Sequence, residues 1–372
     1  IKLYGDKATF NNEIRLSNNG LQADGTIKFL TTTADSKAFT LFPDSLSGIA
    51  EKYKNVEQKG SVEIPESHGS QLMIRYHPKA KVLYTQSRDS AIHLFDNTCK
   101  MRGTTALRPD GMTGKGRIYF NTAELTSRKF KFKTKVIDSD TANFKLKNHD
   151  LTQELAFKTD NVNAHIDFVQ RLGEFKSNGN ETKVEFPENE YICFMDRFKW
   201  FMDNEDIELE SDKRSVSGNI NIDTDIDLSG SNFFSVRQGQ DSLNFAAPKA
   251  KFDLKKKVIT CQKVDFVGVG DARIYPDSNK VLIRRKAEMD PLKNAMIVCN
   301  YVTKYHKITE VTAKISGRKE YKASGKYAYI DENKMEQKIY FANISLDTTF
   351  QTYAKGDVKP EERLDRKSTR LN

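Results

Sequence analysis

The stretch that decides the fold occurs twice: residues 20–41 read GLQADGTIKFLTTTADSKAFTL, and residues 111–132 read GMTGKGRIYFNTAELTSRKFKF. The two align without gaps at an offset of 91 residues. The identical positions are Gly20/Gly111, Gly25/Gly116, Ile27/Ile118, Phe29/Phe120, Thr31/Thr122, Ser36/Ser127 and Phe39/Phe130. Leu21/Met112 and Leu41/Phe132 are similar, and Leu16/Leu107 extends the match upstream. Such self-similarity indicates a repeated structural unit.

The matched positions are those that a strand–turn–strand unit needs. The first glycine suits a turn that requires a positive φ angle. Ile27 and Phe29 are two residues apart, so they point to the same face of a strand. A polar, threonine-rich stretch follows, and a second strand is predicted near Phe39 and, in the other copy, near Phe130. The repeat therefore predicts paired strands with one apolar face.

A shorter unit recurs toward the C-terminus. Its three instances are Ala250–Cys261 (AKFDLKKKVITC), Ala272–Ile283 (ARIYPDSNKVLI) and Ala328–Phe341 (AYIDENKMEQKIYF). Each begins with alanine in a short strand, continues through a polar turn and ends in a second, apolar strand. The sequence leaves open whether the two strands of a unit pair with each other. The prediction is an all-β fold: a repetitive β-solenoid or open β-jellyroll, or stacked antiparallel sheets.

One segment departs from the β pattern. Residues 191–202 (YICFMDRFKWFM) place Tyr191, Met195, Phe198 and Met202 on one helical face, and Pro187 and Glu188 stand just ahead. We therefore predict a short helix near 191–202. An apolar strand pair is the alternative, because short apolar runs fit both structures.

The composition favours an ordered chain that has a high ratio of surface to core. Hydrophobic residues make up 37% and charged residues 30%, yet 23 Phe and 14 Tyr are present. Disordered chains are poor in aromatic residues. Sheets that bury one face and expose the other to solvent combine many aromatic residues with many charged ones. The net charge of +9 favours anionic partners such as lipid, lipopolysaccharide or glycan, although an ordinary solvated surface explains it as well. No compact basic and aromatic patch indicates nucleic acid.

Cysteine use and chain ends say little about compartment. Cys99, Cys193, Cys261 and Cys299 form neither a C-x-x-C motif nor a disulfide scaffold. No apolar run approaches the roughly 20 residues that span a bilayer. The chain starts inside an expected strand and without Met, so we expect it to be part of a longer parent chain.

Domain boundaries are weakly marked. The best break falls in the charged stretch 205–217. It separates a predicted block 1–205, which holds the 91-residue repeat, from a block 218–357, which holds the alanine-led units. The polar tail 361–372 (EERLDRKSTRLN) is predicted to be a non-native or disordered extension.

No catalytic motif is found. The chain contains no G-x-S-x-G, P-loop, H-E-x-x-H or dinucleotide fingerprint, and its six histidines are scattered. His165 and Asp167 alternate within one strand-like run and form a candidate dyad, but a solvated strand face is the favoured interpretation. We therefore predict no catalytic residue and no organic cofactor.

Three acidic residues form the single candidate metal site. Asp223, Asp225 and Asp227 are two apart, so a strand would align their carboxylates on one face. A calcium ion with its preference for oxygen ligands would relieve their repulsion. The run lacks the glycine and glutamate of an EF-hand loop, and a solvated edge strand is the favoured alternative.

The alanine-led units resemble the repeats of OstA-like lipopolysaccharide-transport proteins of Gram-negative bacteria. The resemblance rests on Ala250, Phe252, Val258, Ile259 and Val264. It implies stacked β-coils or an open β-jellyroll and a role as a scaffold or lipid conduit in the periplasm or at the outer membrane. No functional residue carries over.

Three functions follow as hypotheses. The leading one is a non-enzymatic cell-envelope β-repeat scaffold that forms a conduit for lipid or polysaccharide, in which Ile27, Phe29, Ile118 and Phe120 would line the interior. The second is an extracellular adhesin or glycan-binding module with exposed aromatic residues such as Tyr327 and Tyr329. The third is a β-helix polysaccharide-processing enzyme.

Overall fold

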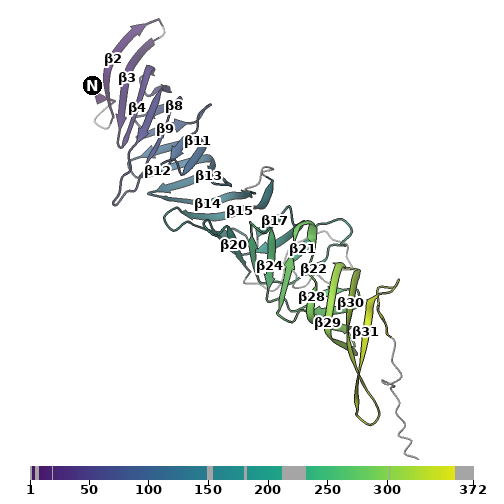
Figure 1. Ribbon diagram of the computed structural model, residues 1–372. Coiled ribbons are helices and arrows are strands. Elements are labelled where there is room, and N and C mark those ends of the chain that lie inside the picture. The colour runs from purple at the N-terminus through teal and green to yellow at the C-terminus, as the bar shows by residue number, and fades with distance from the viewer. Residues whose placement is uncertain are drawn as a thin grey trace, which may run out of the picture. The chain divides into compact units, whose positions relative to one another are not determined.

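The chain is all β, as the sequence predicts (Figure 1). The computed structural model describes residues 2–4, 8–18, 20–148, 154–179, 182–211, 232–300 and 302–356. The strands of the 91-residue repeat and of the alanine-led units pair antiparallel. They fall into two compact units, of which the first comprises residues 1–182 and 199–204 and the second residues 183–198 and 205–372.

The strands have the following bounds. The first sixteen are β1 (Lys2–Leu3), β2 (Ala8–Ser17), β3 (Gly20–Phe29), β4 (Thr32–Leu41), β5 (Leu46–Ala50), β6 (Lys52–Asn55), β7 (Ser67–Gly69), β8 (Leu72–His77), β9 (Val82–Gln86), β10 (Ile92–Leu94), β11 (Cys99–Arg108), β12 (Gly111–Phe120), β13 (Ala123–Lys133), β14 (Val136–Lys147), β15 (Leu155–Asp167) and β16 (Leu172–Ser177). The others are β17 (Thr182–Phe186), β18 (Tyr191–Met195), β19 (Arg197–Phe201), β20 (Asp206–Glu210), β21 (Phe233–Ser235), β22 (Asn244–Phe245), β23 (Lys249–Asp253), β24 (Val258–Gln262), β25 (Val267–Val269), β26 (Ala272–Tyr275), β27 (Lys280–Ile283), β28 (Leu292–Cys299), β29 (His306–Gly317), β30 (Glu320–Ile330), β31 (Glu336–Leu346) and β32 (Thr352–Lys355). A single 3₁₀ turn, η1 (Arg285–Ala287), interrupts the described strands.

The 91-residue repeat is structural. Strands β2, β3 and β4 have the same starting positions as β11, β12 and β13 once 91 is added. In the first copy the pairing shifts register between Ala23 and Gly25, and in the second it shifts between Gly114 and Gly116. Each shift is a β-bulge, which bends the strand.

The bulge glycines are there for close backbone approach. Gly25 has a φ of +150° and Gly116 a φ of +136°. A Cβ atom on Gly25 would lie 2.1 Å from the carbonyl oxygen of Asn11, and one on Gly116 would lie 2.3 Å from that of Arg102. No side chain fits at such distances. The identical glycines of the repeat therefore mark the bend, not only the turn that precedes it.

Because of the bend, the two halves of β4 belong to two different half-sheets of the first unit. The first half of β4 pairs with β6, which continues through β7 and β10 to β11. The second half of β4 pairs with β5, which continues through β8 and β9 to β11. The half-sheets face each other, since the ring centroids of Phe29 and Tyr76 lie 5.0 Å apart. The apolar core lies between them.

An aromatic cluster completes the core of the first unit. Phe144 on β14 is fully buried, and its ring centroid lies 4.4 Å from that of Phe175 and 5.4 Å from that of Trp200. Phe120 joins the cluster at 5.7 Å from Trp200. The burial pattern of β14 alternates strictly at this end, which is why its apolar side chains all reach the same interior.

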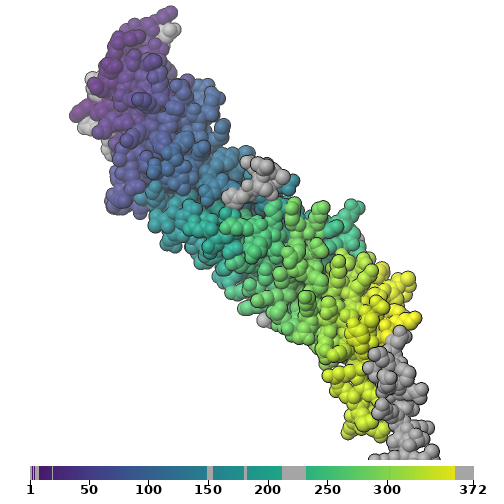
Figure 2. Space-filling model, viewed as in Figure 1, coloured from purple at the N-terminus to yellow at the C-terminus, as the bar shows by residue number. Residues whose placement is uncertain are grey.

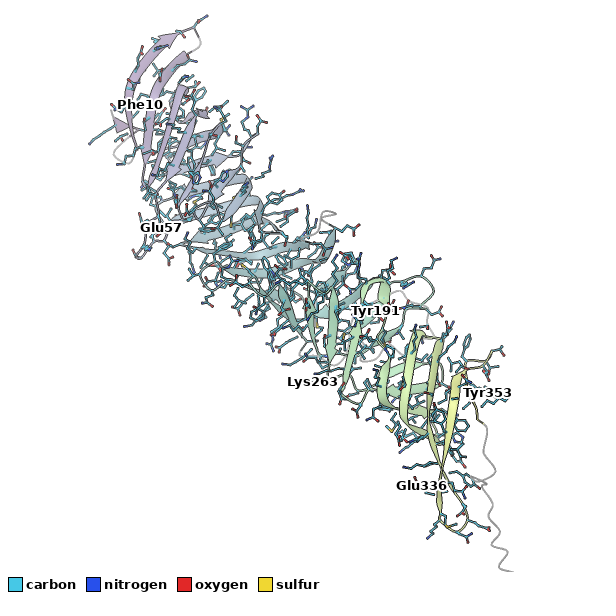
Figure 3. The ribbon with its side chains drawn as sticks, viewed as in Figure 1. Phe10, Glu57, Tyr191, Lys263, Glu336 and Tyr353 are labelled. Carbon is cyan, nitrogen blue, oxygen red and sulfur yellow. The ribbon has the colours of Figure 1, made fainter. Side chains whose placement is uncertain are left out.

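The predicted helix at 191–202 is wrong. Residues 191–195 form β18 and residues 197–201 form β19, and the alternative of apolar strands holds. Tyr191 (labelled in Figure 3), Cys193 and Met195 are buried, as are Phe198 and Trp200, so burial follows a period of two in each strand. The apolar residues seemed to follow a helical spacing because the buried positions are odd-numbered in β18 and even-numbered in β19, with the change at Asp196 between the strands. Pairing of β18 with β21, some 40 residues away along the chain, supplies the backbone partners.

The two strands of an alanine-led unit pair with each other in two of the three units and not in the third. In the first, β23 pairs with β24, and in the last, β30 pairs with β31, so both are hairpins. The middle unit is split, because β26 pairs with β25 and β28 whereas β27 pairs with β24. The same sequence pattern in the second unit thus forms a hairpin in two instances and, in the middle instance, a connection between strands that pair with other partners.

All four cysteines are free and buried, so we expect their thiols to be unreactive in the native protein. Burial raises the pKa of Cys299 to about 11 and raises the pKa of Cys99, Cys193 and Cys261 further. Since the thiolate is the reactive form, we expect no thiol to react quickly with Ellman's reagent at pH 8. Four thiols should react once the protein is unfolded. Cys299 should be the first to react as the pH rises, and mass spectrometry of the labelled chain identifies it.

Candidate functional site

The predicted metal site, Asp223, Asp225 and Asp227, lies outside the part of the chain that the structure describes. Within the described ranges, no three His, Cys, Asp or Glu side chains converge in a way that would hold a metal ion. The described part of the chain also has no helix with the length and hydropathy that crossing a bilayer requires.

His165 has a carboxylate partner, but it is Asp138 and not Asp167. Its Nδ1 lies 2.6 Å from Oδ1 of Asp138 across the β14–β15 pairing. Asp167 instead accepts hydrogen bonds from the backbone of the turn at Val169 and Gln170. Lys133 lies 3.5 Å from Asp138, so the pair belongs to a charged row on an exposed strand face. A surface row of this kind is typical of solvated sheets.

A different row of side chains crosses the first unit. Strand pairing places Lys54, His68, His93, Lys100 and Tyr119 directly opposite one another on β6, β7, β10, β11 and β12. Directly opposite residues in antiparallel strands share a face. Except for Gly69, their neighbours along each strand are buried, so these five point outward. We call these five residues, together with Arg102, the basic row.

The basic row borders a surface cleft of about 640 Å³. The cleft is lined by His68, Gly69, Ser70, Ser90, Ala91, His93, Lys100, Arg102 and Tyr119. The imidazole rings of His68 and His93 stack with centroids 5.2 Å apart and planes 15° apart. Nδ1 of His93 is buried and has no hydrogen-bond partner in the described residues. The cleft therefore offers flat ring surfaces and cationic side chains.

Within the described residues, the lysines and the arginine of the basic row form no ion pair. No carboxylate in the described residues lies within 4.0 Å of the amino groups of Lys54 and Lys100 or the guanidinium of Arg102. Glu66 approaches the row, at 3.9 Å from His68. Uncompensated cations around a concave surface attract anions.

A second cleft, of about 790 Å³, lies in the second unit. Arg237, Arg285, Lys286 and Lys314 line it. Much of its charge is compensated. Glu188 lies 2.9 Å from Arg285 and also pairs with Lys257, and Glu190 lies 3.8 Å from Arg237. This cleft is therefore the weaker candidate for an anion.

The wall of the second cleft is held in an unusual backbone conformation. Lys286 and Ala287 have φ angles of +54° and +52°. Their amides donate to the carbonyl oxygens of Glu188 and Asn189, and the Gln240 amide donates to the carbonyl of Ala287. These hydrogen bonds hold a conformation that costs free energy in isolation. The side chain of Gln240 is therefore a structural support of this wall.

Sequence reasoning missed the basic row because its members come from five strands between residues 54 and 119. Only Lys100 and Arg102 show a local signal, since they alternate with buried Cys99 and Met101. The histidines look scattered until the register places His68 opposite His93. No protein-family model, curated protein or solved structure matches this chain. The geometry of the basic row is therefore the evidence on function.

Proposed function

We propose that the protein is a non-enzymatic β-repeat scaffold of the cell envelope that binds an acidic glycan along the basic row. The observation that carries the proposal is the uncompensated cationic charge around the cleft at His68 and His93. Carboxylate or phosphate groups on a sugar chain would pair with Lys54, Lys100 and Arg102. The OstA-like resemblance supports the placement in the envelope, where such glycans occur.

The spacing of the row suits an extended polymer. Neighbouring strands lie about 4.8 Å apart, so Lys54 and Lys100, three strands apart, are separated by about 14 Å. A sugar chain that crosses the strands would meet a ring or a cation at each step. Tyr119 and the stacked histidines present apolar ring faces with polar edges, which suit the faces of sugar rings.

The proposal places the ligand outside the sheets. Ile27, Phe29, Ile118 and Phe120, the positions that a conduit would use as its lining, are at most 3% exposed. They pack into the core between the half-sheets, where burial supplies stability. The outward side chains at the same strand positions differ between the two copies of the repeat. Lys100 and Tyr119 correspond to Thr9 and Lys28, so the frame repeats while the surface varies.

Removal of the three cations should abolish most glycan binding. We expect the triple variant Lys54→Gln, Lys100→Gln and Arg102→Gln to bind oligogalacturonate at least about 10-fold more weakly, since each cation near an anionic surface contributes on the order of 1 kcal/mol. Isothermal titration calorimetry at low salt measures the affinity. Binding by the wild type should weaken as salt rises, because exposed charges are screened.

The control removes the same charge elsewhere. Lys293, Lys307 and Lys322 are exposed lysines of the second unit, and their replacement by Gln also lowers the net charge from +9 to +6. This control should bind like the wild type, and neutral dextran should bind to none of the proteins. Equal losses in both triple variants would reduce the effect to net charge and refute the basic row as the site. Absence of wild-type binding to oligogalacturonate and to phosphorylated glycan alike would refute the function.

A further inference from the structure

Strand pairing continues the basic row beyond the cleft, toward the first copy of the repeat. Lys54 on β6 lies opposite Thr33 on β4, and Thr33 lies opposite Lys28 on β3. Lys28 lies opposite Thr9 on β2. Both neighbours of each of these residues along its strand are buried. The four side chains therefore point outward and share one face of the sheet.

Pairing also continues the row beyond Tyr119 in the other direction. Tyr119 on β12 lies opposite Glu124 on β13, and Glu124 lies opposite Lys145 on β14. Both residues again stand between buried neighbours and point outward. The resulting line has one residue on each strand that it crosses, and we call it the extended row. Its members in order are Thr9, Lys28, Thr33, Lys54, His68, His93, Lys100, Tyr119, Glu124 and Lys145.

The extended row passes through equivalent positions of the two copies of the repeat. Lys28 on β3 has the same place in the first copy as Tyr119 on β12 in the second. Thr33 on β4 likewise corresponds to Glu124 on β13. Strands β6, β7 and β10 join the two copies by continuous pairing. The continuity of the line therefore comes from the repeated frame.

Four lysines of the extended row carry unpaired charge at nearly regular intervals. In the part of the chain that the structure describes, no carboxylate lies within 4.0 Å of the amino groups of Lys28, Lys54, Lys100 and Lys145. Successive lysines are two, three and three strands apart, which corresponds to about 10, 14 and 14 Å along the row. Glu124 is the one acid in the extended row. A polymer that crosses the strands would meet a free cation at every second or third strand.

The twist of the sheet selects among anionic partners. Neighbouring strands are rotated relative to one another, and Figure 1 shows the strand direction changing between β2 and β14. Figure 2 shows the surface of this region, from purple to blue-green. The outward face therefore turns along the row. A flat surface would meet only a few of the lysines at once, whereas a flexible chain follows all of them.

We propose that the extended row binds one acidic polysaccharide chain along its whole length, with Lys28 and Lys145 as binding residues about 38 Å apart along the row. The inference rests on the proposed function and adds a length requirement to it. A chain that reaches both lysines gains two charge contacts that a short oligomer at the cleft lacks. Glu124 opposes the long chain where it passes from β12 to β14.

The experiment compares a short and a long ligand of the same chemistry. Isothermal titration calorimetry at low salt measures binding of the trimer and of the dodecamer of galacturonate to the 372-residue protein. The double variant Lys28→Gln and Lys145→Gln should bind the trimer like the wild type. It should bind the dodecamer about 10-fold or more weakly, because loss of one cation near an anionic ligand costs about 5-fold in affinity. Glu124→Gln should bind the dodecamer about 3-fold or more tightly, because a like charge is removed.

Matched controls change the same charges in the second unit. The double variant Lys293→Gln and Lys307→Gln and the single variant Glu320→Gln alter exposed residues and should bind both oligomers like the wild type. Trp200 emission in urea verifies that the first unit of each variant is folded. The trimer also serves as an internal control, since its binding at the cleft needs neither Lys28 nor Lys145.

The outcomes distinguish this inference from the function on which it rests. If the wild type binds neither oligomer, both fail. If it binds both, and the change at Lys28 and Lys145 leaves dodecamer affinity unaltered or weakens trimer and dodecamer equally, the extended row alone is refuted. Equal dodecamer losses in the variant at Lys293 and Lys307 would reduce the effect to net charge and refute it as well. Tighter binding to phosphatidylglycerol vesicles than to the dodecamer, lost with Lys28 and Lys145, would assign the row to a lipid surface instead.

Discussion

Replacement of Phe144 by alanine is expected to lower the free energy of unfolding of the first unit by about 3–5 kcal/mol. Phe144 is fully buried, and its ring contacts those of Phe175 and Trp200. The smaller side chain would lose these contacts and leave a cavity that two sheets cannot easily close. Trp200 is the sole tryptophan and is 3% exposed, so its fluorescence reports unfolding of this unit directly.

The matched control for this change is Phe42→Ala. Phe42 belongs to the same unit and is 46% exposed, so the same truncation should cost less than about 1 kcal/mol. Urea titrations followed by Trp200 emission give both values. Equal midpoints for Phe144→Ala and the wild type would contradict the described core.

The second large effect is expected at the bulge. Gly116→Ala should destabilise the first unit by about 3 kcal/mol or more, because the new Cβ would lie 2.3 Å from the carbonyl oxygen of Arg102 and the φ angle is positive. The two strands would have to separate where they now touch. Trp200 fluorescence in urea again provides the measurement.

Gly111→Ala is the control that separates the backbone cost of a positive φ angle from the cost of the close contact at Gly116. Its φ of +134° nearly equals the +136° of Gly116, but a Cβ there would have no atom within 4 Å. Gly111→Ala should therefore cost only the conformational term, about 1–2 kcal/mol. If the two alanine variants were equally stable, the contact between β11 and β12 at the bulge would not be the reason for the glycine.

Local pattern was sufficient for the fold class. The offset of 91 predicts paired strands, and the structure places β3–β4 and β12–β13 on the repeated residues. This succeeded because alternation, turn glycines and apolar pairs act over a few residues, which is the range that a sequence pattern covers. The same reasoning failed at 191–202, where two strands with opposite burial phase mimic one helix. Backbone partners distant in the chain decide that case.

The candidate surfaces were beyond local pattern. Lys54, His68, His93, Lys100 and Tyr119 are adjacent only because five strands pair in one register. Likewise, Leu107 is buried because strand pairing places β9 beside β11.

The sequence by itself determined that the chain folds as repeated antiparallel β units with buried Ile and Phe positions and glycines at set points. Only the tertiary structure decided which outward residues meet and which strands pair. The reason is physical: the inward side chains must satisfy packing in every repeat, whereas the outward side chains are free to vary, and their neighbours are chosen by strand pairing across long stretches of chain.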